Sequence, residues 1–125
     1  MTRSSSERRP PKRGWVYLAD LGAAHGTEPG KLRPVLVLQT DLLNAHHGST
    51  VVVPLTTQLK DEGAPLRVRF AKGEAGLRAE SEAVVDQLRS IDNRRLRGPL
   101  GGAPARLVAE TAVKVARLLD LPDAV

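Results

Sequence analysis

RPVLVLQ, residues 33–39, is the stretch that decides the fold. Its apolar run, Val35 to Leu38, is too short for a buried helix and is rich in β-branched residues, which favours a strand. A continuous apolar run predicts burial on both faces, as in a closed barrel rather than an open sheet. The strand nevertheless begins with a charge, Arg33, which Pro34 restricts to an extended backbone. That arginine is either a solvated loop charge or a cation held at the strand edge to bind something.

Further short strands are predicted on both sides of this one. Pro54 lies in the third strand, where it cannot donate a ladder hydrogen bond, so it marks a bulge, an edge or a bend. In LRVRF, residues 66–70, Arg67 and Arg69 alternate with apolar residues, which is typical of a solvated strand face. The predicted strands are residues 15–21, 33–39, 50–58, 66–70 and 82–91.

The C-terminal part of the sequence predicts one helix, with Pro104 in its first turn and its end near Leu121. Glu110 and Lys114 form an i, i+4 pair opposite an apolar stripe. A short helical turn capped by Asp41 and a turn over residues 92–98 are also expected. Together these elements predict a β-rich fold, a small twisted β-barrel of about five to seven strands with a C-terminal helix. The stripe consists of Leu107, Val108, Ala112, Val115, Leu118 and Leu119.

The charge of the protein is concentrated at one end. The chain has 125 residues and a net charge of +5, of which residues 1–13 supply +4 through five basic residues and one acidic residue. Residues 14–125, the single predicted domain, are nearly neutral, with 14 basic and 13 acidic residues. The tail, residues 1–13, is therefore expected to be a disordered, solubilising arm, with nonspecific phosphate binding as the alternative.

Several classes of function are disfavoured by the composition. The sequence contains no cysteine, so disulfides, thiolate zinc sites and cysteine nucleophiles are excluded. Its three histidines are His25 and the adjacent pair His46 and His47, a poor spacing for a metal site. There is no phosphate-binding glycine loop, no apolar stretch long enough to cross a membrane and no apolar core of a secretory signal. A cytoplasmic protein that uses no metal and no cofactor is expected.

RNA cleavage is compatible with this composition, because the substrate supplies its own nucleophile, the 2′-OH. The reaction requires proton transfer to and from oxygen atoms and a cation that stabilises the phosphorane. An arginine guanidinium binds two phosphate oxygens at once and remains charged at any working pH, which makes it a poor proton donor. Arg33 is therefore assigned a stabilising role first and a proton-transfer role second. A binding module without catalysis is the other possibility.

A set of motifs in a fixed order resembles the MazF/PemK family of toxins. No single motif is specific, but their order and spacing together are, and they extend over residues 13 to about 121. The motifs are GWVYLADL at 14–21, GTE at 26–28, RPVLVLQ at 33–39, VPLTTQ at 53–58, GL at 76–77, Ser81 and DQLRSID at 86–92. Two departures are a tryptophan at position 15, where the family commonly has an acidic residue, and Thr27 in place of a serine.

The resemblance implies a metal-independent, sequence-specific endoribonuclease that cuts single-stranded RNA and leaves a 2′,3′-cyclic phosphate and a 5′-hydroxyl. It also implies an SH3-like barrel, a homodimer and a MazE-like antitoxin whose tail covers the RNA groove. The family's catalytic arginine and threonine match Arg33 and Thr56. Thr57 has the same chemistry, but strand alternation allows only one of the two threonines to face the site.

The resemblance also suggests residues that contact RNA, with an exposed loop or barrel surface as the alternative for each. The arginines at 94, 95 and 97 are expected to form a solvated turn. Gln87 and Arg89 are predicted to share one strand face, and Ala64 with Pro65 is predicted to border a base pocket. The candidate RNA-binding residues are Thr27, Glu28, Gln58, Pro65, Gln87 and Arg89.

Two other functions fit the same barrel. A gyrase-poisoning toxin of the CcdB kind depends on a tryptophan-bearing C-terminus, whereas this chain ends LPDAV, residues 121–125. A catalytically silent barrel that only binds RNA or protein remains possible, because intact motifs do not prove the geometry of a site.

Overall fold

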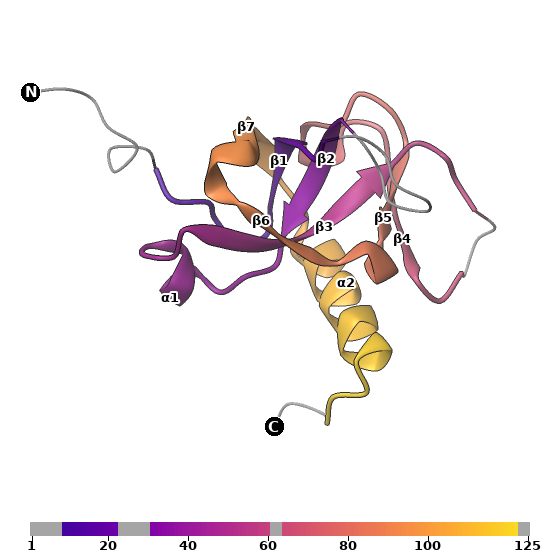
Figure 1. The fold of residues 1–125 in the computed structure, drawn as a ribbon. Coiled ribbons are helices and arrows are strands. Elements are labelled where there is room, and N and C mark those ends of the chain that lie inside the picture. The colour runs from indigo at the N-terminus through magenta and orange to yellow at the C-terminus, as the bar shows by residue number, and fades with distance from the viewer. Residues whose placement is uncertain (1–8, 23–30, 61–63, 123–125) are drawn as a thin grey trace, which may run out of the picture.

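The computed structural model describes residues 9–22, 31–60 and 64–122, and shows one twisted antiparallel sheet with a C-terminal helix (Figure 1). Within these residues the sheet is accompanied by the α-helices α1 (Asp41–Asn44) and α2 (Ala105–Leu118) and by the 3₁₀ turns η2 (Glu74–Gly76), η3 (Val85–Gln87) and η4 (Asn93–Arg95). The strands are β1 (Trp15–Asp20), β2 (Leu32–Val37), β3 (Ser49–Thr56), β4 (Arg67–Phe70), β5 (Ser81–Val84), β6 (Arg89–Asp92) and β7 (Leu96–Gly102).

Strand β3 is the centre of the sheet. The order is β4-β5-β3-β2-β1-β7, and β6 also pairs with β3. One edge of β3 pairs with β2, while its other edge pairs first with β6 and then with β5. The β-rich fold with a C-terminal helix is confirmed. Among the described residues no pairing joins β4 to β7, so the sheet is barrel-like and twisted but is not the closed barrel that the sequence suggested.

The core has two parts, one on each face of the central strands. Leu36 packs into the larger cluster with Val53 and Phe70, whereas Val35 and Val37 pack into a second cluster. All three β2 residues are fully buried, so the prediction that residues 33–39 include a strand buried on both faces is confirmed. The charged start of β2 is thus attached to a rigid strand.

Pro54 lies where β3 changes partner. Val52 pairs with Arg89 of β6, and Leu55 pairs with Ala83 of β5. Pro54, which has no N–H to donate, lies in the short interval between these two pairings. Of the bulge, edge or bend that Pro54 suggested, the structure shows a change of partner, at which the last residues of β3 leave β6 and pair with β5.

The strand predicted over residues 82–91 is wrong as a single element. It is divided into β5, η3 and β6, because the chain must turn a corner to pass from the end of β3 to its beginning. The Leu88 N–H donates to the carbonyl of Val85 at 3.1 Å and closes that turn. The turn predicted over residues 92–98 contains η4, but from Leu96 onward the chain forms β7, an edge strand whose glycines and Pro99 are typical of a loop.

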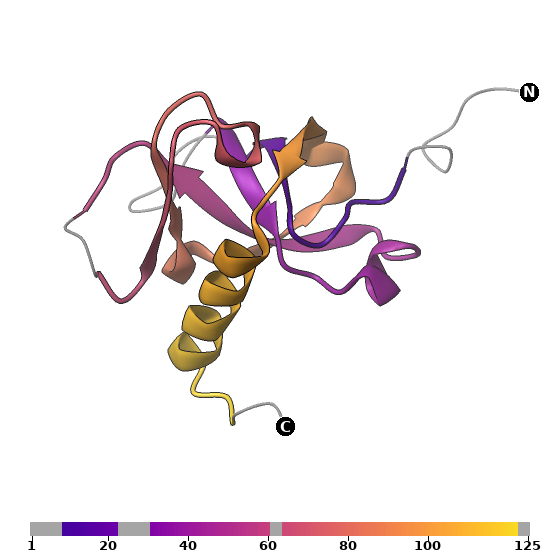
Figure 2. The same cartoon turned by 180° about the vertical axis from the view of Figure 1, so that it is seen from behind.

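Helix α2 packs against β4 and η3, and Figure 2 shows from behind how the helix extends away from the sheet. Pro104 caps it instead of lying in its first turn, and the helix ends at Leu118 rather than near Leu121. Leu107 is buried as predicted, but Leu118 and Leu119 are exposed because the helix extends beyond the sheet. At α1 the cap is Thr40, whose Oγ1 accepts from the Leu42 N–H, and not Asp41.

Asp41 instead accepts a hydrogen bond from the backbone N–H of Arg13 at 2.8 Å. The backbone N–H of Lys12 donates to the Tyr17 hydroxyl at 3.0 Å. The segment immediately before β1 is thus attached to the sheet, whereas the expectation for residues 1–8 lies outside the described residues.

No helix in the described part of the chain has the length and apolar character needed to cross a membrane.

Candidate active site

Arg33 is the second residue of β2, and its backbone is fixed by pairing with Ala19 of β1. The side chain is exposed, and its Nη1 donates to the carbonyl oxygen of Leu32 at 3.3 Å. Within residues 9–22, 31–60 and 64–122 its guanidinium forms no ion pair. An exposed arginine on a rigid strand, with most of its five N–H donors unused by these residues, is suited to bind an anion.

Extending the pairing of β2 and β3 beyond its last pair aligns Arg33 with Thr56. Val35 lies opposite Pro54, and the two strands are antiparallel. Continuing that register by two residues toward the start of β2 puts Arg33 opposite Thr56. Opposite residues of an antiparallel pair point to the same side, with Cβ atoms about 4.5–5.5 Å apart. The two candidate catalytic side chains therefore belong to one face of the sheet, where β2 begins and β3 ends.

Thr56 is the last residue of β3 and is half-buried. Its Oγ1 accepts a hydrogen bond from the backbone N–H of Gln58 at 3.1 Å, which orients the hydroxyl. Because this bond uses a lone pair and not the proton, the hydroxyl can still donate to a ligand. Thr57 is exposed and lies beyond the strand, so Thr56 is the threonine that the strand register aligns with Arg33.

On its other side, Thr56 pairs with Glu82 of β5, and Glu82 pairs with Arg69 of β4. With Arg33 in register, four side chains on one face form a row across β2, β3, β5 and β4. Glu82 is only 2% exposed although it is a carboxylate. A buried charge requires partners, because removing it from water costs several kcal/mol.

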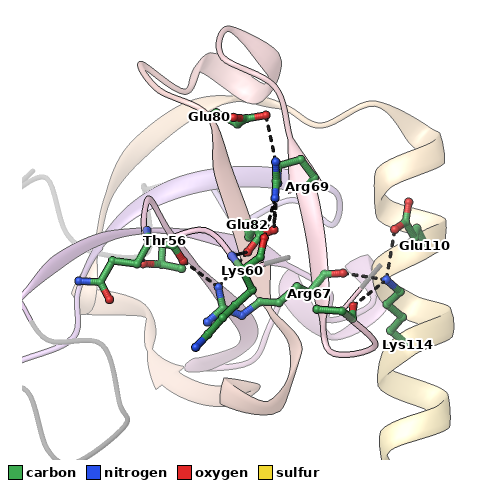
Figure 3. Close-up of polar contacts among 10 residues, drawn as sticks. Thr56, Lys60, Arg67, Arg69, Glu80, Glu82, Glu110 and Lys114 are labelled. Carbon is green, nitrogen blue, oxygen red and sulfur yellow. Dashed lines mark hydrogen bonds and ion pairs between the residues drawn. The ribbon is translucent and has the colours of Figure 1, made fainter. Parts of the chain in front are cut away.

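Two arginines and one backbone amide supply those partners (Figure 3). Glu82 Oε1 accepts from the Lys60 N–H at 2.8 Å and from Arg67 Nη1 at 3.0 Å. Glu82 Oε2 accepts a hydrogen bond from Arg69 Nε at 2.9 Å and forms an ion pair with Arg69 Nη2 at 2.8 Å. Arg67 and Arg69 are therefore ion-paired, and the expectation that they form a solvated strand face is wrong. The sheet places a buried carboxylate between them, so their charge is held inward.

The electrostatic balance keeps Glu82 ionised. Burial alone would raise its pKa, but the hydrogen bond from the Lys60 amide and the bonds and charges of Arg69 and Arg67 outweigh burial. The net result is a pKa below the ordinary value of 4.5. At neutral pH this site is thus a charged, fully hydrogen-bonded cluster next to Thr56.

The remaining candidate residues lie at different places around this row. Gln58 is exposed two residues after Thr56, and Pro65 is exposed in the turn before β4. Gln87 lies in η3 and Arg89 begins β6, so the prediction that these two share one strand face is wrong. Both are half-buried, and both make polar contacts. Thr27 and Glu28 lie outside the described residues.

The basic turn and the histidines lie elsewhere on the surface. Arg94 binds Asp92 and Arg97 binds Asp20, at 3.0 and 3.4 Å, and both arginines are exposed. His46 and His47 are exposed after α1. In the part of the chain that the structure describes, no group of three or more histidine, cysteine, aspartate or glutamate residues could hold a metal ion.

The sequence model of the family described as PemK-like, MazF-like toxin of type II toxin-antitoxin system matches residues 12–119. The chain belongs to this family.

Relatives and solved structures agree with the assignment to the MazF/PemK family. The chain is 38% identical to endoribonuclease EndoA of Bacillus subtilis over 68% of its own length and 73% of that protein. It is 34% identical to endoribonuclease MazF of Staphylococcus saprophyticus, over 71% of its length and 74% of that protein. The fold is similar to a MazE–MazF structure from Deinococcus radiodurans, with a TM-score of 0.74, 28% identity, and coverage of 92% of this chain and all of that chain.

Sequence reasoning missed Glu82, which pairs with Thr56 across β3 and β5. The signal was present, because SEAVV at 81–85 has one acidic residue in an otherwise buried strand. An isolated carboxylate in such a strand predicts a cationic partner, and RVRF at 67–70 offers two arginines with the spacing of one strand face. Only the register of β4 and β5 shows that they meet.

Proposed function

We propose that this protein is the toxin of a type II toxin-antitoxin system and that it cleaves single-stranded RNA without a metal or cofactor. The main support is the strand register, which, continued beyond Val35 and Pro54, aligns exposed Arg33 with Thr56 where β2 begins and β3 ends. The names of the relatives add to it, since both are called endoribonucleases.

In the proposed reaction the 2′-oxygen of one nucleotide attacks the adjacent phosphorus, and the bond from phosphorus to the 5′-oxygen breaks. The 2′-OH loses its proton and the leaving 5′-oxygen gains one, so the products are a 2′,3′-cyclic phosphate and a 5′-hydroxyl. Arg33 binds two phosphate oxygens through its planar fork, and its charge stabilises the phosphorane as negative charge builds up. Thr56 donates its hydroxyl proton to a phosphate oxygen as a hydrogen bond.

The other candidate residues are assigned to RNA binding around this pair. Gln58, Pro65, Gln87 and Arg89 are assigned to contacts with the RNA strand, and Thr27 with Glu28 belongs to the same proposal on the basis of the family motif alone. Base edges are read by amide and carboxylate hydrogen bonds, and single-stranded RNA exposes those edges.

We also infer a homodimer and a MazE-like antitoxin that covers the RNA groove, with the cytoplasm as the site of action. The structure from D. radiodurans contains MazE together with MazF. A domain of this size gains stability by burying further apolar surface in a twofold pair. Sedimentation as a monomer at micromolar concentration would contradict the dimer.

Incubation with a long RNA in EDTA, followed by mapping of the cut ends, tests the nuclease directly. We expect discrete cuts with 5′-hydroxyl ends, and a loss of at least about a hundredfold in Arg33→Ala, because a positioned donor to the transition state is removed. Arg33→Lys retains the charge but not the fork and should recover part of the rate. Thr56→Val should lose about ten- to a hundredfold, the value of one hydrogen bond to a charged group.

Arg117→Ala is the matched control, because it removes an equally exposed arginine from α2. Its rate should equal that of the wild type. Intact RNA with the wild-type protein would favour the silent barrel, and normal cleavage by Thr56→Val would show that Thr56 is the wrong threonine.

A further inference from the structure

Residues 56–60 begin with Thr56, the last residue of β3, and include Gln58; from Thr57 onward the chain has left the strand ladder. Side chains therefore have to satisfy and orient its backbone, since no neighbouring strand does so. The Lys60 N–H donates to Glu82 Oε1 at 2.8 Å, and the Lys60 carbonyl accepts from Arg69 Nη2 at 3.0 Å. One cluster thus binds both polar backbone groups of Lys60.

The same cluster extends to Gln58. Its carbonyl accepts from Arg67 Nη1 at 3.0 Å, and its N–H donates to Thr56 Oγ1 at 3.1 Å. The Arg67 guanidinium therefore contacts both Glu82 and the residue whose amide orients the Thr56 hydroxyl. A continuous set of hydrogen bonds leads from the buried carboxylate to that hydroxyl (Figure 3).

Helix α2 supports this arrangement from behind. Lys114 Nζ donates to the carbonyl of Arg67 at 2.7 Å and forms an ion pair with Glu110 at 3.4 Å. The predicted i, i+4 pair is therefore present, but Lys114 points toward β4 and not away from the packed face. The backbone of Arg67 is fixed on the helix side while its side chain is fixed by Glu82.

A purely structural function does not account for where these bonds go. Two ion pairs would neutralise Glu82 without any contact to residues 56–60. Instead, three backbone groups of that short segment are bonded directly to the cluster. Those bonds define the direction in which the segment leaves the sheet, and hence where Thr56 and Gln58 point.

We propose that Glu82 is a positioning residue for RNA cleavage. With Arg67 and Arg69 it fixes residues 56–60, so that the Thr56 hydroxyl faces the phosphate and the Gln58 side chain faces the RNA. Glu82 itself touches no substrate. The inference rests on the proposed nuclease function, and it assigns a role in that site to three residues that the sequence placed on a solvated strand or did not single out.

Steady-state cleavage of a short RNA separates positioning from support of the fold. Glu82→Ala should lower kcat by about ten- to a hundredfold, since a displacement of about 1 Å has effects of that size, with a smaller rise in KM. Glu82→Gln retains an oxygen acceptor for the Lys60 N–H and should lose only a fewfold. Arg67→Met should resemble Glu82→Ala, and it takes the place of that variant if Glu82→Ala does not fold.

Glu80→Ala is the matched control. Glu80 contacts Arg69 at 3.3 Å, is half exposed, and bonds to no backbone group of residues 56–60. We expect wild-type kcat from this variant. Equal losses in the Glu80 and Glu82 variants, or an unchanged kcat in folded Glu82→Ala, would overturn the positioning role.

Amide hydrogen exchange tests the same proposal without any RNA. Exchange at the Lys60 N–H should become faster in Glu82→Ala by more than the general increase that its lower global stability gives to amides of β1 and β2, and should remain slow in Glu80→Ala. This result does not depend on nuclease activity, so it stands even if the protein cleaves no RNA. Unchanged exchange at Lys60 would show that Glu82 does not hold the segment.

Discussion

Arg33 and Arg67 have the same charge and lie on neighbouring parts of one sheet, but their surroundings are opposite. Arg33 is exposed and donates to the carbonyl of Leu32, whereas the Arg67 side chain is 17% exposed and bonds to Glu82 and to the Gln58 carbonyl. The first guanidinium can exchange water for a phosphate. The second already has its anion, and its charge acts on the protein's own backbone.

The difference shows that arginine can serve in one site both as the cation that binds the substrate and as a cation that holds the protein backbone in place. A cation that is to stabilise a transition state must not be neutralised in the ground state, because only differential binding accelerates a reaction. A cation that is to hold a loop must be neutralised, because an unpaired charge would be hydrated and mobile. Among the described residues Arg33 has no anionic partner and so satisfies the first condition, whereas the pair Arg67 and Arg69 satisfies the second.

The largest effect on stability should separate the two regions most clearly. Glu82→Ala leaves two arginines facing a vacated, buried position, so the free energy of unfolding should fall by about 3 kcal/mol, the lower end for removing one partner of a buried ion pair. The arginines are partly exposed and can regain water, which limits the loss. Arg33→Ala should change it by less than about 0.5 kcal/mol, as at other exposed sites.

Urea denaturation followed by circular dichroism measures both values under one set of conditions. Glu80→Ala provides the control for removal of a carboxylate from the same strand region. If Arg33→Ala destabilises the protein as much as Glu82→Ala does, the contrast between a substrate-binding arginine and arginines that hold the fold is wrong.

Strand β2 could be predicted from sequence because its signal is local, and the candidate pair could be proposed from local motifs of the family. The apolar run from Val35 to Leu38 fixes burial on both faces, and Arg33 and Thr56 each occur in a compact motif. The β7 strand was not predicted, because glycine and proline in LRGPLGG at 96–102 are typical of loops. An edge strand with bulges tolerates both residues, since one of its sides needs no regular ladder.

The Glu82 cluster could not be predicted, because its members are joined only by strand register. Arg67 and Arg69 precede Glu82 by more than ten residues, and the alternation of RVRF is equally typical of a solvated face. Even the spacing of Gln87 and Arg89 misled, since a 3₁₀ turn interrupts the apparent strand. Local patterns identify residues that have a function by themselves, but not residues that act through one another.

A smaller effect is expected in acid. Because the pKa of Glu82 is lowered in the folded protein, its contribution to stability is complete above its ordinary pKa of 4.5 and is lost as the pH falls through the lower, folded value. Around it lie the guanidinium groups of Arg67 and Arg69 and the backbone amide of Lys60, and the carboxylate of Glu80 contacts Arg69. The free energy of unfolding should therefore decrease as the pH is lowered below 4.5.

Glu82→Gln should reduce that acid dependence, because the amide cannot be protonated in this range. Melting temperatures measured from neutral pH downward give the slope for each protein, with Glu80→Gln as the control. Equal slopes in the wild type and Glu82→Gln would mean that other carboxylates account for the acid sensitivity.

The smallest effect should come from the exposed pair Asp92 and Arg94, although the pKa shift there is large. The Arg94 side chain and backbone N–H hold the pKa of Asp92 at about 2, well below its ordinary 3.8. Any stability it supplies is present above the ordinary value and is lost as the pH falls through about 2. Both groups are solvated, so exposure to salt and water leaves little net stabilisation.

The Asp92→Asn variant keeps an oxygen acceptor for the Arg94 N–H. Its urea midpoint at neutral pH should not differ measurably from that of the wild type, whereas NMR titration of the wild type should give the low pKa of Asp92. A clear loss of stability in Asp92→Asn would mean that burial is not what distinguishes the Glu82 cluster from the pairs on the surface.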